Sequence, residues 1–172
     1  GKEHFLSVSR DLTERKKAEK VIAEAHSLIK QVTECAEDGI AVCDKELRYQ
    51  IWNPAMEKMT GKKAADVLGK RAGDVFPVLA ESGVLEALQR IITNGTSYRN
   101  EFPFEIPDSD KKGWAADSSS PLQNAQNEIT GAIGIVRDIT ERKKMEQTLK
   151  EKLDDHEKRL DGPAPEGLDN AG

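Results

Sequence analysis

The chain has 172 residues, of which 37% are hydrophobic and 33% are charged, and its formal net charge is −5. This length suits one domain with appendages, and the acidic balance argues against a nucleic-acid-binding surface. No stretch approaches the roughly 18 apolar residues of a membrane span and no secretory signal opens the sequence, so we expect a cytoplasmic fragment without a membrane segment. The spacing of Cys35 and Cys43 fits neither a redox pair nor a zinc site, and no metal site is expected.

An eight-residue stretch occurs twice with one difference, as RDLTERKK at residues 10–17 and RDITERKK at 137–144. Each copy ends an apolar run and begins a charged, helix-favouring run, so each predicts a point where a strand leaves a domain and becomes a helix. Residues 4–9, before the first copy, are therefore predicted to form a strand. This interpretation makes residues 1–12 the end of a preceding, similar domain.

Residues 13–38 predict one long linker helix. Along it, Val21, Ala25, Leu28 and Val32 recur at steps that alternate between four and three, which is the seam spacing of a coiled coil. A single helix would leave this seam in water, so the favoured interpretation is a parallel homodimer. The alternative is that the stripe packs on its own domain.

The next residues predict a hairpin, with apolar strands over 40–43 and 47–53. Pro54 then begins a short helix that Gly61 ends, because proline fits the first helical position and glycine a helix stop. Residues 62–80 predict only short helical pieces.

A clearer helix over 82–93 comes before three more strand-like stretches, at 98–106, 112–122 and 129–139. Polar turns join these stretches, so neighbouring strands are expected to be antiparallel. A final helix is expected over 141–160. The tail at 161–172 is rich in glycine, proline and acidic residues and is expected to be disordered.

This order predicts an α+β fold with a core over 39–140. The core is a five-stranded antiparallel sheet with short helices on one face, flanked by N-terminal and C-terminal coiled-coil-like helices. It resembles the PAS domain, a family of cytoplasmic sensor and interaction modules. The resemblance is carried by IWNPAMEKMTG at 51–61, similar to the signature after the second strand, and by RDITER at 137–142, similar to the motif that joins PAS cores to output helices.

The resemblance implies a sensory or signal-relay module that covers about residues 34–142. It also implies an effector, such as a histidine kinase, in the same chain. The sequence of this fragment contains no catalytic constellation, so no catalytic residues are expected in it. Strand alternation predicts that dry-face and helix side chains line a ligand pocket: Val42, Trp52, Asn53, Met56, Val75, Phe76, Leu88, Phe102, Phe104, Ile133 and Ile135. The main alternative is a ligand-free dimerisation spacer between signalling domains.

The cofactor stays unknown at this point. Histidine-ligated haem is not expected, because His4, His26 and His156 all lie outside the core. Covalent flavin photochemistry is not expected either, because Cys43 lies in the first strand rather than just after the second. Non-covalent flavin or a small metabolite remains open.

The second motif copy is the predicted signal junction, formed by Asp138, Thr140, Glu141 and Arg142. Asp138 and Glu141 have the spacing of a helix-capping box, and Arg142 is expected to reach back and pair with Asp138. The alternative is an ordinary capped helix without a relay role. His156-Glu157-Lys158-Arg159 is faintly similar to a histidine-kinase phosphoacceptor motif, but a solvated helical histidine is the favoured interpretation.

Overall fold

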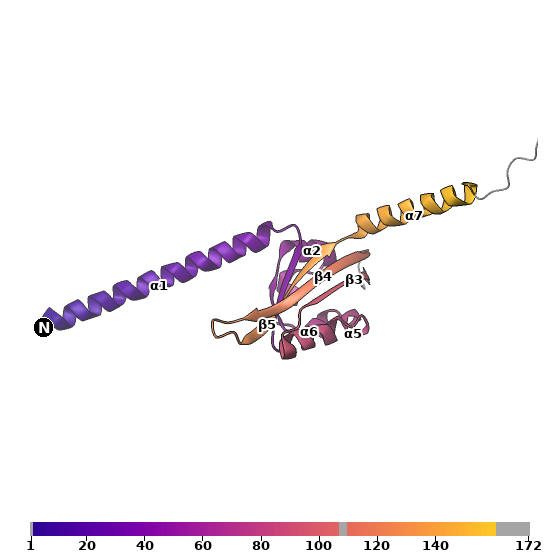
Figure 1. The fold of residues 1–172 in the computed structure, drawn as a ribbon. Coiled ribbons are helices and arrows are strands. Elements are labelled where there is room, and N and C mark those ends of the chain that lie inside the picture. Colours follow the sequence, from indigo (N-terminus) through magenta and orange to yellow (C-terminus); the bar gives the residue numbers. More distant parts are fainter. Residues whose placement is uncertain (1, 107–109, 161–172) are drawn as a thin grey trace, which may run out of the picture.

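The computed structural model describes residues 2–106 and 110–160, with the side chains of residues 14–106 and 110–159. Five antiparallel strands form one sheet in the order β2-β1-β5-β4-β3 (Figure 1). The predicted α+β class and antiparallel sheet are therefore confirmed. The strands are β1 (Gly39–Asp44), β2 (Tyr49–Trp52), β3 (Tyr98–Glu105), β4 (Lys112–Gln123) and β5 (Ile129–Asp138).

Short helices cover one face of this sheet, and two long helices flank the core. Gly61 and Gly95 end α2 and α6 in the left-handed conformation, which glycine adopts without steric cost. The helices are α1 (Lys2–Cys35), α2 (Pro54–Thr60), α3 (Ala64–Val67), α4 (Ala72–Val75), α5 (Val78–Glu81), α6 (Val84–Asn94) and α7 (Thr140–Leu160).

The inner faces of the central strands carry mainly small side chains. Ala41 on β1, Ala115 on β4, and Ala132 and Gly134 on β5 all face the helices. Larger side chains from β2 and the helices, such as those of Trp52 and Phe76, pack over them in the main core cluster. Small residues opposite large ones leave room between the two layers, and this room becomes the cavity described below.

The N-terminal segment differs from its prediction. Residues 4–9 lie within α1 instead of forming a strand, and α1 ends at Cys35 rather than at residue 38. A strand requires a hydrogen-bonding partner, and none of the described strands pairs with these residues. The first motif copy is thus wholly helical, whereas the second spans the end of β5 and the start of α7. The assignment of residues 1–12 to a preceding domain stays a prediction.

The seam of α1 does not pack on its own domain. Val21, Leu28 and Val32 are 64%, 61% and 60% exposed, and Ala25 is exposed as well. Figure 1 shows both long helices projecting away from the core. The alternative of a self-packed stripe is therefore wrong, and pairing with a second copy stays a prediction.

The predicted tail at 161–172 and part of the turn after β3, residues 107–109, lie outside the described residues. Among the described helices, none combines the length and the apolar character that a membrane crossing requires.

Candidate functional site

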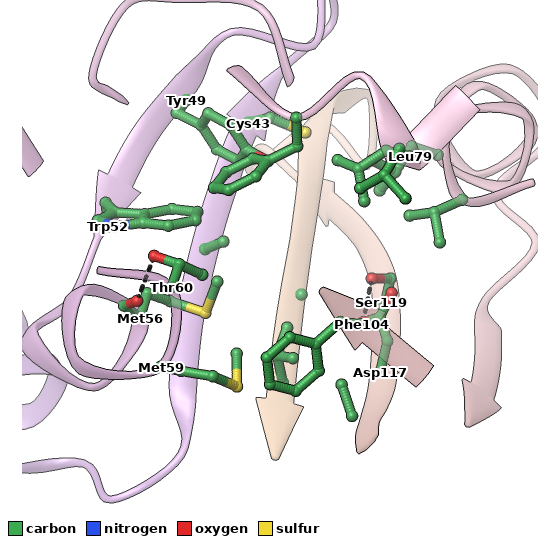
Figure 2. Close-up of a pocket in the computed structure, with 18 of the residues that line it drawn as sticks. Cys43, Tyr49, Trp52, Met56, Met59, Thr60, Leu79, Phe104, Asp117 and Ser119 are labelled. Atoms are coloured by element: carbon green, nitrogen blue, oxygen red, sulfur yellow. Dashed lines mark hydrogen bonds between the residues drawn. The ribbon is translucent and has the colours of Figure 1, made fainter. Parts of the chain in front are cut away.

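A cavity of about 120 Å³ lies between the inner face of the sheet and the helices. Figure 2 shows Tyr49 and Trp52 on one side of it and Phe104, Asp117 and Ser119 on the other. The structure places these predicted residues on its wall: Trp52, Met56, Phe76, Leu88, Phe102 and Phe104.

Three predicted pocket residues lie on the opposite face of the sheet. Val42, Ile133 and Ile135 alternate with residues that line the cavity, so their side chains point away from it. The prediction was wrong because β1 and β5 are apolar on both faces, so hydrophobicity alone did not reveal which set points inward. The smaller members of each strand face the helices, and the larger ones face outward.

Two more predicted residues, Asn53 and Val75, do not line the cavity. Val75 ends α4 and packs against the main core cluster. Asn53 is buried, but its side chain forms hydrogen bonds with backbone groups at the edge of the core, as described below. Both predictions failed because burial in the core does not imply contact with the cavity.

Aromatic rings form one wall of the cavity. The rings of Trp52 and Phe76 stack with centroids 5.6 Å apart, and Tyr49 meets Trp52 edge-on at 4.9 Å. The indole N–H of Trp52 donates to the carbonyl of Lys62 at 3.2 Å, so its polar atom is satisfied away from the cavity. This wall offers a flat apolar surface against which a ring or an aliphatic chain can pack.

The opposite wall carries a buried carboxyl group. Asp117, on β4, is 5% exposed, and its Oδ1 accepts a hydrogen bond from the Ser119 hydroxyl at 2.8 Å. Burial raises the pKa of Asp117, and the bond from Ser119 partly opposes that rise. The sequence analysis missed both residues because a polar stretch in a strand carries no hydrophobic signal. Their alternation with buried Ala115 was the only sign that they face inward.

Cys43 and Tyr49 also line the cavity, on the side away from Asp117. Burial raises the pKa of the Cys43 thiol to about 11, so it stays protonated and unreactive at neutral pH. Burial also raises the pKa of Tyr49, with a smaller contribution from Asp117. Among the described residues, the cavity wall therefore offers hydrogen bonding and electrostatics, and its one thiol is not activated.

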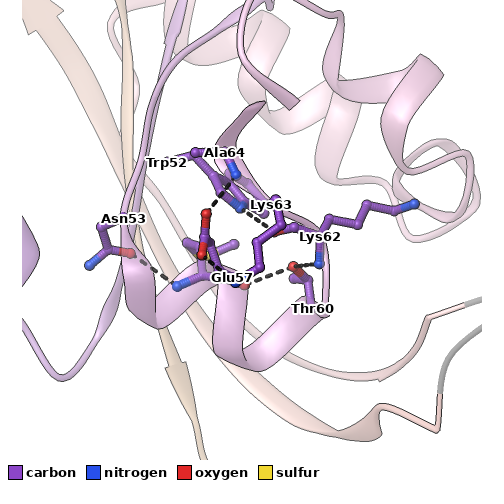
Figure 3. Close-up of polar contacts among 8 residues, drawn as sticks. Trp52, Asn53, Glu57, Thr60, Lys62, Lys63 and Ala64 are labelled. Atoms are coloured by element: carbon purple, nitrogen blue, oxygen red, sulfur yellow. Dashed lines mark hydrogen bonds and ion pairs between the residues drawn. The ribbon is translucent and has the colours of Figure 1, made fainter. Parts of the chain in front are cut away.

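Asn53 joins α1, β1 and α2 at the edge of the core. Figure 3 shows its side chain at the start of α2. Its Oδ1 accepts from the backbone N–H groups of Ile40 at 2.8 Å and Met56 at 3.0 Å, the latter capping α2. Its amide donates to the carbonyls of Thr33 and Asp38, each at 3.0 Å. The four bonds fix the point at which the N-terminal helix enters the core.

A second contact closes the same entrance. The guanidinium of Arg137 on β5 donates to both oxygens of Asp38, at 2.8 and 2.6 Å. Hydrogen bonding to Arg137 lowers the pKa of Asp38. Because Arg137 directly precedes the C-terminal junction, the start of the core and its end are linked by one ion pair.

The C-terminal junction is anchored to β4. The Thr140 hydroxyl accepts from the Trp114 N–H at 3.0 Å, and the Ile139 N–H donates to the Trp114 carbonyl at 2.8 Å. Asp138 Oδ1 accepts from the Thr140 N–H at 2.9 Å, which satisfies one free donor at the start of α7. Ile139 is buried, so the first residues of the junction cannot shift independently of the sheet.

The charged side chains at this junction pair differently from the prediction. Arg142 does not pair with Asp138 but contacts Glu101 on β3 at 2.6 Å, and Lys143 contacts the same carboxylate at 2.8 Å. The Asp138 side chain is directed to the backbone, and β3 brings Glu101 within reach, which no local spacing could predict. Lys143 and Arg142 together lower the pKa of Glu101.

Glu141 does not close the predicted capping box. Its carboxylate pairs with Lys144 at 2.8 Å along α7. The Lys143 ammonium lies over the Trp114 ring, 5.1 Å from its centroid. The junction is therefore held by Trp114 and Glu101 from two strands, rather than by a helix cap alone.

The structure describes few groups suited to metal or cofactor chemistry. Among the described residues there is no cluster of three or more His, Cys, Asp or Glu side chains placed to hold a metal ion. His26 and His156 are exposed on the long helices, and the side chain of His4 lies outside the described part of the chain. A cavity of about 120 Å³ is below the roughly 300 Å³ of pockets that hold drug-sized ligands, so a flavin would require it to expand.

We expect Asp117→Asn to stabilise the free protein at pH 8 by on the order of 1 kcal/mol, since a buried unpaired charge is costly. The folded pKa of Asp117 is raised, so its favourable neutral form is fully present below the ordinary value of 3.8. The stability that the neutral carboxyl group contributes is lost as the pH rises through the folded pKa. Thermal unfolding at pH 4 and pH 8 should therefore show a larger gain at pH 8. Asp66→Asn, on the exposed surface of α3, should show no such difference.

Known proteins and solved structures share sequence and fold with this chain. The chain is 24% identical over 123 residues to the aerobic respiration control sensor protein ArcB of Escherichia coli, an alignment that covers 72% of this chain and 16% of ArcB. The chain thus matches about one sixth of the length of that curated relative.

Two of the solved structures similar to this chain illustrate the fold. The PAS domain of Bordetella pertussis BvgS matches with 24% identity and a TM-score of 0.57, over 77% of this chain and 98% of that one. A PAS domain from Colwellia psychrerythraea matches with 22% identity and a TM-score of 0.56, over 68% and 98%. The family model described as the PAS fold matches residues 34–144, which is more than half of the chain, and the chain therefore belongs to the PAS family.

Proposed function

We propose that this chain is a sensory and relay module of a cytoplasmic signal-transduction protein. In this proposal a small ligand occupies the cavity, and the resulting strain passes along β4 and the junction into α7. Helix α7 leads to an effector such as a histidine kinase. Similarity to a curated sensor protein supports the signalling role.

One observation carries the proposal: a single strand lines the cavity and also holds the start of α7. On β4, Ala115, Asp117 and Ser119 lie on the cavity wall. The neighbouring Trp114 exchanges hydrogen bonds with Ile139 and Thr140 through its backbone groups. A displacement of β4 by a ligand would therefore move the first residues of α7 directly.

We expect Glu101→Gln to weaken this connection while leaving the core folded. The change removes the charge that Arg142 and Lys143 share, so the first turn of α7 should open more often. Hydrogen exchange of residues 140–146 should accelerate several-fold, with unchanged exchange in β1 and β5. Glu105→Gln on the same strand is the matched control. Equal exchange in the two variants would contradict a role of Glu101 at the junction.

The relay itself is tested by a cavity ligand in the unaltered chain. A compound found to bind in the cavity by a thermal-shift screen should change hydrogen exchange at residues 139–144. The same compound should have a smaller effect there in Glu101→Gln. Binding that leaves these residues unaffected would contradict the relay.

A second candidate function is a ligand-free dimerisation spacer. The exposed seam of α1 favours it, since Val21, Leu28 and Val32 stay in contact with solvent. On the outer face of the sheet, Ile135 is a further exposed apolar side chain, at 45%. We propose no catalytic role for His156, because its side chain is solvent-exposed on α7. Its change to alanine should therefore affect neither folding nor ligand binding.

A further inference from the structure

The charges on the cavity wall are unbalanced. Among the described residues that line it, Asp117 is the single carboxyl group, and neither lysine nor arginine is present. Most of the other wall residues are apolar, including Trp52, Phe76 and Leu88. A carboxyl group in such surroundings is stable when ionised only if a positive charge or a strong donor comes close.

The protein itself supplies one donor to this carboxyl group. Ser119 donates to Oδ1 at 2.8 Å, and none of the described side chains donates to Oδ2. The Thr60 hydroxyl, across the cavity, donates to the Met56 carbonyl at 2.7 Å, so its proton is already used. A carboxylate accepts several hydrogen bonds, and here one side of it is left for a molecule inside the cavity.

We propose that the cavity binds a small, largely apolar organic amine, whose protonated nitrogen donates to Asp117 while its apolar part packs against Trp52 and Phe76. This assignment rests on the proposed sensory function and names its ligand class. The volume of about 120 Å³ suits a molecule of one ring. A dry apolar cavity of about 150 Å³ holds benzene in another protein.

The ligand charge would also act on the wall itself. A cation beside Asp117 favours the ionised carboxylate, which the empty cavity disfavours. The change in charge takes place on β4, three residues from Trp114, whose backbone holds the start of α7. Amine binding therefore alters the strand that the proposed relay uses.

The test compares three probes of similar shape and different charge, namely benzylamine, benzyl alcohol and benzoate. Their dissociation constants are measured at pH 7 by ligand-observed NMR with the unaltered chain and with Asp117→Asn. We expect the unaltered chain to bind benzylamine at least tenfold more tightly than benzyl alcohol and to reject benzoate. Asp117→Asn should lose this preference for benzylamine, while its binding of benzyl alcohol changes less than threefold.

Equal binding of benzylamine and benzyl alcohol by the unaltered chain would overturn the assignment, and so would undiminished benzylamine binding by Asp117→Asn. Binding of none of the probes would overturn it as well. If Asp117→Asn does not fold, the comparison of probes on the unaltered chain still decides. Benzylamine binding without altered hydrogen exchange at residues 139–144 would uphold the ligand class and contradict the relay. A failure of the ligand assignment can therefore be told apart from a failure of the relay.

Discussion

Asn53→Ala is expected to lower the free energy of unfolding by about 3 kcal/mol. The change removes two acceptor contacts, to the N–H groups of Ile40 and Met56, and two donor contacts, to the carbonyls of Thr33 and Asp38. Losing the cap of α2 costs about 1 kcal/mol, and each buried group left unpaired costs about 1–3 kcal/mol, partly offset by water. Urea unfolding followed by circular dichroism measures the loss.

Two variants separate the role of Asn53 from a general effect of substitution. Asn53→Asp keeps the acceptor oxygen but places a second oxygen against the carbonyls of Thr33 and Asp38, so it should be almost as destabilising. Asn94→Ala changes an exposed residue at the end of α6 and should shift stability by less than about 0.5 kcal/mol. A loss below 1 kcal/mol for Asn53→Ala would show that the four contacts contribute little to the stability of the fold.

Charging the seam of α1 is expected to break the proposed homodimer. In the double variant Val21→Lys with Leu28→Lys, the dimer dissociation constant should rise at least about 100-fold. Burying each such side chain contributes about 1.5–3 kcal/mol, and every 1.4 kcal/mol changes the constant tenfold. Sedimentation equilibrium of the unaltered and variant chains measures the change.

The opposite face of α1 provides the control. Ala23→Lys with Ser27→Lys adds the same charge at exposed positions off the seam and should leave the dissociation constant within about threefold. Cys35 continues the seam and is exposed, so mild oxidation of a parallel dimer should link the two copies. A chain that stays monomeric at 100 µM would contradict the dimer.

Much of the architecture could be predicted from local patterns. Pro54 and Gly61 marked the ends of α2, and the polar turns separated the strands to within a few residues. Local patterns could not predict which alternate side chains of the central strands face the helices. Val42 and Ile135 are as apolar as any core residue, yet they lie on the outer face, because the helices pack against the smaller side chains.

The candidate site was only partly predictable for a related reason. Aromatic residues such as Trp52 and Phe104 could be assigned to the cavity because large apolar side chains tend to be buried. Asp117 could not, because its burial depends on neighbours from β3 and β5 that lie far away in the sequence. Likewise, Arg142 pairs with Glu101, 41 residues earlier, and with Glu146 rather than with the nearby Asp138.

The two copies of the repeated motif adopt different structures although their sequences differ at one position. By itself the sequence determined that each copy starts or continues a charged helix, because Thr, Glu, Arg and Lys favour one there. Only the tertiary structure decided what precedes that helix. Arg137 and Asp138 are extended because they pair with Ala116 and Ala115 of β4. Their counterparts at residues 10 and 11 have no such strand beside them among the described residues, and the backbone there satisfies its hydrogen bonds as a helix.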